Sequence, residues 1–184
     1  MESNVTSKPT LTWTLDTAHS QMQFKVRHMM LTTVTGEFRE FEINVETEGT
    51  DFSTAKINAS ANVGSATTGS EQRDAHLKSD DFFNAEQFPR LTFTGNSLMH
   101  VGDDHWILKG DLTIRDITKP ISLECLYMGM MDDPWGNTKV GFEVNGKVSR
   151  KEFGLKWDVV TEAGGVVAGD EVRIHCNVQF IKQK

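Results

Sequence analysis

The sequence is short of the residues and segments that mark several protein classes. Its 184 residues include only 2 cysteines, 4 prolines and 1 tyrosine. Two cysteines are too few for a disulfide scaffold or for a zinc site built from CxxC pairs. No apolar run approaches the ~18 residues that a membrane-spanning helix needs. The opening residues 1–9 show no basic segment followed by an apolar one, so we expect no secretory signal and a cytoplasmic protein.

Motifs for catalysis and nucleotide binding are also missing. The sequence contains no HExxH, GxSxG, P-loop or GxGxxG pattern. His19 and Ser20, with Asp16 nearby, are the residue types of a catalytic triad, but neighbours on a strand point to opposite faces. Asp74 and His76 are two residues apart in a helical segment, a spacing at which side chains do not face each other. We therefore expect no catalytic residues, no metal and no cofactor.

Positive charge is scarce. The chain has 19 basic and 26 acidic residues, which gives a formal net charge of −7. Nucleic acids and anionic lipid headgroups both require a basic face on the protein. The acidic balance therefore argues against either as the main partner, and we expect no nucleic-acid partner.

The sequence does have enough apolar residues for one sizeable core. They make up 38% of the chain, and its length is typical of a single domain. No linker or internal repeat divides it, so we expect one domain over residues 11–182 after a flexible N-terminus over residues 1–10. Cys125 and Cys176 each lie among alternating apolar residues. They are either buried free thiols or a disulfide that joins two late strands.

Apolar and polar residues alternate along most of the chain, which is typical of half-buried β-strands. The clearest runs are 22–26, 57–63, 106–114, 121–127, 140–148 and 172–180. A change of parity between Val34 and Glu48 predicts a β-bulge near Glu40. The one helical segment runs from Gly69 to Ala85, and Thr68 with Glu71 resembles a capping box at its start.

Many strands joined by short turns favour a closed barrel, because closure leaves no unpaired sheet edge. Counting the short Leu11–Leu15 strand gives eight or nine strands, and a barrel of about eight has room inside for side chains or one small ligand. Small inward-facing residues such as Gly36 and Gly110 alternate with large ones such as Phe24 and Phe93. That pattern fits either tight packing or an apolar cavity. Eight methionines favour the cavity, since flexible thioethers suit an adaptable lining.

Four segments together resemble one protein family. They are Trp13–Met29 with Val34–Phe38, then Arg73–Asn84 continuing to Phe93, then Gly110–Ile114 with Thr118–Ile121, and finally Ser149–Leu155. In this order the chain resembles the YceI-like, polyisoprenoid-binding, lipocalin-like family from about Trp13 to Phe180. The resemblance implies an all-β fold, an extended eight-stranded antiparallel lipocalin-like barrel with a short helical insertion around residues 70–85. It also implies a long apolar channel for a polyisoprenoid or similar long-chain lipid, and a homodimer as an expected partner arrangement.

The predicted function is therefore the non-enzymatic binding or carriage of a polyisoprenoid, an isoprenoid quinone or a fatty-acid-like molecule. Two alternatives stay open: an enzyme that acts on an apolar substrate in the same cavity, and a ligand-free stress or interaction protein with a filled barrel. For Arg73 and Asp74, a role in tying the insertion to the barrel rim is the alternative to headgroup contact. The predicted ligand-binding residues are Met22, Phe24, Val26, Phe38, Phe41, Ile57, Phe93, Trp106, Leu108, Leu112, Leu123, Tyr127, Phe142, Val144 and Ile174, and the predicted mouth residues are His28, Arg73 and His76.

Overall fold

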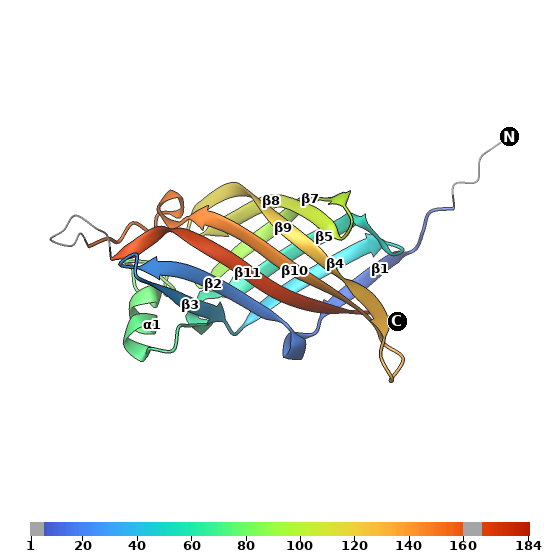
Figure 1. Cartoon of the computed structure of the whole chain (residues 1–184), viewed down its shortest axis with the longest axis horizontal. Coiled ribbons are helices and arrows are strands. Elements are labelled where there is room, and N and C mark those ends of the chain that lie inside the picture. Colours follow the sequence, from blue (N-terminus) through green and yellow to red (C-terminus); the bar gives the residue numbers. More distant parts are fainter. Residues whose placement is uncertain (1–5, 160–166) are drawn as a thin grey trace.

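The computed structural model describes residues 6–159 and 167–184, which build an elongated barrel with one α-helix at one end (Figure 1). The predicted flexible segment 1–10 falls in part on residues 1–5, which lie outside the described residues. The strands are β1 (Thr10–Leu15), β2 (Gln21–His28), β3 (Thr32–Phe38), β4 (Phe41–Glu48), β5 (Asp51–Asn62), β6 (Ala66–Thr67), β7 (Arg90–Gly102), β8 (His105–Ile114), β9 (Ile117–Asp132), β10 (Thr138–Ser149) and β11 (Ala168–Lys182). The helices are α1 (Glu71–Lys78) and the short 3₁₀ turns η1 (Thr17–His19), η2 (Val63–Ser65) and η3 (Arg150–Phe153).

Strand β11 closes the barrel, because it pairs with β10 along one edge and with β1 and β2 along the other. The hydrogen-bonded ring runs β1-β4-β5-β7-β8-β9-β10-β11 and returns to β1, and β2, β3 and β6 extend the sheet beside β11. All of these pairings are antiparallel. The predicted eight-stranded antiparallel barrel with one short helix is confirmed.

Two of the barrel strands are interrupted. Leu15 on β1 pairs with Phe180, and Gln21 on β2 pairs with Asn177. Between these two pairs the chain from β1 to β2 advances six residues while β11 advances three. The turn η1 accommodates the extra residues. The strand from β3 to β4 breaks at Arg39 and Glu40, where the alternation of apolar residues changes parity. The sequence analysis predicted a β-bulge near Glu40; the structure instead has a two-residue break there between β3 and β4.

Helix α1 begins two residues later than its sequence pattern indicated. Ser70 is the N-cap, and its hydroxyl accepts a hydrogen bond from the Arg73 N–H at 3.3 Å. Thr68, the expected cap, instead donates its N–H and its hydroxyl to the Asp74 carboxylate, both at 2.7 Å. The helix buries no residue completely, so it depends on such contacts for its position.

Strands β1, β5 and β10 reach the end of the barrel away from α1 (Figure 1), and aromatic rings from these strands pack together inside it. Trp13 is 1% exposed, and its indole N–H donates to the Thr47 hydroxyl at 2.9 Å. The Phe52 ring packs against Trp13 at 5.4 Å and against Phe142 at 5.2 Å. This end of the barrel is therefore closed by its own core.

Cys125 and Cys176 are both buried free thiols, which settles the choice left open by the sequence. They lie on β9 and β11, and each pairs with Val144 on the intervening strand β10. Burial raises the pKa of each thiol to about 12, so neither is a reactive thiolate at neutral pH.

No helix among the described residues is long and apolar enough to cross a membrane.

Candidate functional site

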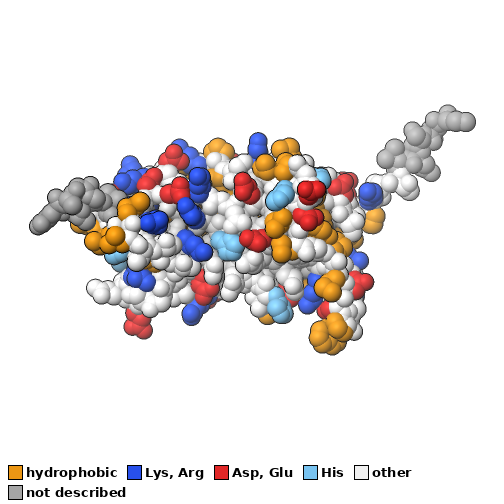
Figure 2. All heavy atoms as spheres, in the orientation of Figure 1, with side chains coloured by type: hydrophobic (Ala, Val, Ile, Leu, Met, Phe, Trp, Pro, Cys, Tyr) orange, Lys and Arg blue, Asp and Glu red, His pale blue; other side chains and the backbone are white. Residues whose placement is uncertain are grey.

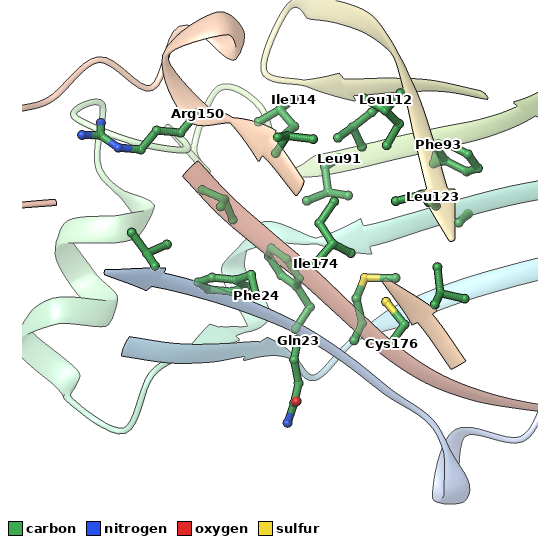
Figure 3. Close-up of a pocket in the computed structure, with 18 of the residues that line it drawn as sticks. Gln23, Phe24, Leu91, Phe93, Leu112, Ile114, Leu123, Arg150, Ile174 and Cys176 are labelled. Atoms are coloured by element: carbon green, nitrogen blue, oxygen red, sulfur yellow. The ribbon is translucent and has the colours of Figure 1, made fainter. Parts of the chain in front are cut away.

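The barrel encloses an apolar cavity of about 420 Å³, within the range of ~300–1,000 Å³ that is usual for small-molecule sites. In Figure 3 the side chains of Phe24, Leu91 and Ile174 point into this space, while Gln23 on β2 points away from it. Phe93, Leu112 and Leu123 continue the lining toward the closed end. The interior is therefore hollow over part of its length and packed solid at one end.

Most of the residues predicted to bind the ligand do lie together around this cavity. They come from strands on all sides of the barrel, because the period-two alternation put them on one face of each strand. Their binding role itself stays a prediction. The ones that line the cavity are Met22, Phe24, Val26, Phe38, Ile57, Phe93, Leu108, Leu112, Leu123, Phe142, Val144 and Ile174, and the three predicted mouth residues His28, Arg73 and His76 line it as well.

Phe41, Trp106 and Tyr127 do not line the cavity, contrary to the sequence prediction. All three are partly buried and pack against the core. The Tyr127 ring packs on Phe142 at 5.6 Å, and the Trp106 ring packs on His100 at 5.0 Å. They share the inward parity, but parity fixes only the face of a strand and not whether the interior beside it is hollow.

The inward-facing glycines give large side chains room to lie flat against the wall. A Cβ on Gly36 would come within 2.3 Å of the Phe24 ring, and one on Gly110 within 2.4 Å of the Phe93 ring. Large residues therefore do pack against small ones, as one of the two sequence interpretations had it. A cavity remains between the walls all the same, so both interpretations describe part of the interior.

The cavity opens at the α1 end. There its lining includes Arg27, His28 and Arg73, all exposed to solvent, whereas at the other end it includes the buried rings of Phe52 and Phe142. The lining near the opening also takes in several residues that the sequence analysis did not select. These are Leu77, Phe82, Phe83, Arg150, Leu155, Trp157 and Val167.

Arg73 and Asp74 tie α1 to the barrel rim. The Arg73 guanidinium donates to the Thr68 hydroxyl at 2.6 Å and to its carbonyl at 2.8 Å, and the Asp74 carboxylate accepts from Thr67 and Thr68. Burial raises the pKa of Asp74, but these hydrogen bonds and the charge of Lys78 outweigh it and hold the pKa below its ordinary value. The contacts favour the structural role for this pair.

His76 lies in an aromatic cluster at the mouth. Its ring packs edge-on against Phe82 at 5.0 Å and Trp157 at 4.8 Å, and its Nε2 lies 2.8 Å from the Asp81 carboxylate. Arg115, from the turn between β8 and β9, donates to the Asp80 and Phe82 carbonyls and so holds the segment that follows α1. These rings cover one side of the opening.

Arg150 is the one strongly buried charged residue that lines the cavity in the described part of the chain, at 4% exposure. Its guanidinium donates to the carbonyls of Leu155, Trp157, Ala168 and Gly169 at 2.7 to 3.0 Å. These bonds join η3, the segment after it and the start of β11, and Figure 3 shows the side chain at the α1 end. In the sequence, the only signal for Arg150 was its position within the Ser149–Leu155 motif.

The groups considered for catalysis do not converge. His19 pairs with Asp16 at 2.9 Å, while Ser20 accepts from the Gln179 N–H at 3.0 Å, so His19 and Ser20 do not pair. His28 and His76 line the cavity, but His19 does not. Within residues 6–159 and 167–184, no cluster of three histidine, cysteine or acidic side chains could hold a metal ion.

Residues 13–180, nearly all of the barrel, match the YceI-like domain family. The chain belongs to the YceI-like family. The YceI protein of Escherichia coli is 35% identical to it over 166 residues, which cover 90% of this chain and 83% of that protein. The crystal structure of the Campylobacter jejuni YceI protein superposes with a TM-score of 0.74 at 27% identity, covering 93% of this chain and 98% of that one.

A polyisoprenoid binding domain from Saccharophagus degradans shares the fold, with a TM-score of 0.68 at 14% identity over 94% of this chain and 99% of that domain. Within the YceI-like segments identified in the sequence, Arg73–Asn84 and Ser149–Leu155 meet at the cavity mouth. Two of the four segments thus lie at the open end of the barrel.

Proposed function

We propose that this YceI-like barrel binds and carries one long-chain amphipathic lipid, without changing it chemically. The candidates are a polyisoprenoid, an isoprenoid quinone and a fatty-acid-like molecule. The observation that carries the proposal is the apolar cavity, closed by Trp13, Phe52 and Phe142 at one end and open beside α1 at the other. A chain can enter such a cavity by its apolar tail and leave its polar head at the mouth.

The energetics of such binding rest on the apolar tail. Burial of each methylene contributes about 0.8 kcal/mol. At ~30 Å³ for a group of water size, a cavity of about 420 Å³ holds roughly 14 such groups. The cavity therefore fits a chain of about this length, and we propose that a longer one leaves its remainder outside.

We expect the polar groups at the mouth to contribute little to ligand selectivity. Arg73 is bonded to Thr68, His76 to Asp81, and Arg150 to four carbonyls. These bonds use four of the five Arg150 N–H groups but only two of the five on Arg73, so the donors left for a headgroup are few and lie mainly on Arg73. Chain length and shape would then select the ligand. The similarity in fold to a polyisoprenoid binding domain supports a prenyl chain as one candidate.

A chain-length series tests this proposal. For delipidated protein titrated calorimetrically with alcohols of roughly 10 to 20 carbons, affinity should rise about fourfold per methylene and level off near ~14 carbons. Val144→Trp fills the middle of the cavity, so the plateau should move to shorter chains. Glu124→Trp, exposed on the adjacent strand, is the matched control and should bind as the wild type does. Equal effects of the two substitutions, or no binding of any chain, would refute the proposal.

A further inference from the structure

The turn between β2 and β3 presents three exposed apolar side chains at the cavity mouth. Met29, Met30 and Leu31 are 43%, 59% and 77% exposed. The Met29 N–H donates to the Val167 carbonyl at 2.8 Å, and both Val167 and the adjacent His28 line the cavity. The apolar tip, as we name residues 29–31, therefore lies on the rim of the opening.

Behind this tip, three basic side chains form a row across adjacent strands. Lys25 on β2 pairs with Arg173 on β11, which pairs with Lys147 on β10. Their side chains share the outer face of the barrel, since Phe24, Val148 and Ile174, next to them in sequence, face inward. Like charges directly opposite each other destabilise a sheet. We call residues 25, 147 and 173 the basic row. A contribution to barrel stability therefore does not explain why these three charges lie side by side.

The charges near the row leave it positive. Glu171 reaches both Arg173, at 3.3 Å, and Lys147, at 3.8 Å, and so offsets one of the three charges. Arg27 adds another cation between the row and the tip, with its guanidinium bonded to the Met30 carbonyl at 2.8 Å. Figure 2 shows Lys and Arg groups gathered toward the end of the barrel that carries exposed hydrophobic side chains near α1.

Acidic residues lie at both ends of the barrel: Glu71, Asp80 and Asp81 are on the α1 side of the mouth, and a second group is at the other end. The hairpin turns at the other end of the barrel carry Glu48, Asp51, Asp103, Asp104, Asp132 and Asp133. A second set of exposed apolar residues, Met128, Met131 and Trp135, adjoins these acidic residues. The net charge of −7 thus conceals a basic area beside the mouth, and the sequence-level argument against anionic lipid headgroups does not hold for that area.

We propose that the mouth end is a docking surface for an anionic lipid bilayer. The apolar tip enters the interfacial layer, and the outer face of β2, β11 and β10 rests its basic row on the headgroups. Apolar side chains flanked by Lys and Arg are the combination that binds an anionic membrane surface, with ~1 kcal/mol per basic residue near it. Docking in this way holds the cavity opening against the bilayer. Docking requires no lipid in the cavity, so its test is independent of the proposed lipid carriage.

Vesicle co-sedimentation tests the docking surface. Wild-type protein should bind vesicles of equal parts phosphatidylcholine and phosphatidylglycerol, bind pure phosphatidylcholine far less, and be released by added salt. Lys25→Gln, Lys147→Gln and Arg173→Gln together should weaken binding on the order of a hundredfold, from roughly fivefold per charge. The control Lys56→Gln, Lys109→Gln and Lys119→Gln removes three exposed charges from other strands and should leave most of the binding intact.

The apolar tip is tested by Met30→Asp with Leu31→Asp. Met30 has a φ of 57°, a conformation that aspartate tolerates well, so the fold should survive. Binding should fall at least roughly tenfold. Met128→Asp with Met131→Asp, equally exposed, is the control and should bind like the wild type.

A stability measurement distinguishes a membrane-binding role of the basic row from a purely structural one. The triple glutamine variant should unfold at the same or a higher urea concentration than the wild type, because like-charge repulsion is relieved. Binding to neutral and anionic vesicles alike, equal losses in variants and controls, or no binding at all would each overturn the proposal. Cargo binding measured without vesicles should be unchanged in these variants.

Discussion

Phe24 and Gly36 show how single residues set the width of the channel. The two residues pair across β2 and β3, and the Phe24 ring occupies the space that a side chain at position 36 would need. The ring therefore lies along the wall instead of crossing the cavity. Phe93 and Gly110 repeat this arrangement on β7 and β8.

Gly36→Ala should narrow the cavity. The new methyl group would lie 2.3 Å from the Phe24 ring, so the ring must turn inward or the strands must shift. Such overpacking typically costs about 1–3 kcal/mol of stability. We expect weaker uptake of long-chain alcohols by calorimetry and a lower urea midpoint. Adding Phe24→Leu should restore both, and a failure of this rescue would show that the ring does not set the width.

At the scale of elements, α1 is attached to the rim by a small polar network. Asp74 accepts hydrogen bonds from Thr67 and Thr68, Arg73 donates to Thr68, and Arg115 holds the segment after the helix. Since the helix buries no residue completely, apolar packing alone does not fix it. The opening of the channel thus depends on a few hydrogen bonds.

Asp74→Asn should loosen this attachment. Because the pKa of Asp74 is lower in the folded protein, its ionised form stabilises the fold above about pH 4, and this stabilisation is lost as pH falls through the lowered pKa. Hydrogen–deuterium exchange over residues 70–78 should be faster in the variant near neutral pH, and the difference should vanish in acid. Glu71→Gln on the same helix is the control. An exchange difference that persists in acid would contradict the role given to the carboxylate.

At the scale of the whole molecule, the sequence predicts the barrel well because most of the long strands carry a period-two pattern. It predicts the cavity less well, since the inward parity of Trp106 and Tyr127 says nothing about where the hollow part ends. Arg150 bonds main-chain carbonyls, and that leaves no trace in a hydrophobic pattern. The basic row escapes notice too, because Lys25, Lys147 and Arg173 meet only through the register of three strands.

The contents of the natural cavity test lipid carriage most directly. The protein should be purified from its source without detergent, extracted with organic solvent, and the extract analysed by mass spectrometry. We predict one class of long-chain amphipathic lipid in near-stoichiometric amount, and its loss from the Val144→Trp variant but not from Glu124→Trp. An extract that holds only solvent, from a protein that also takes up no added prenyl or fatty chain, would contradict lipid carriage.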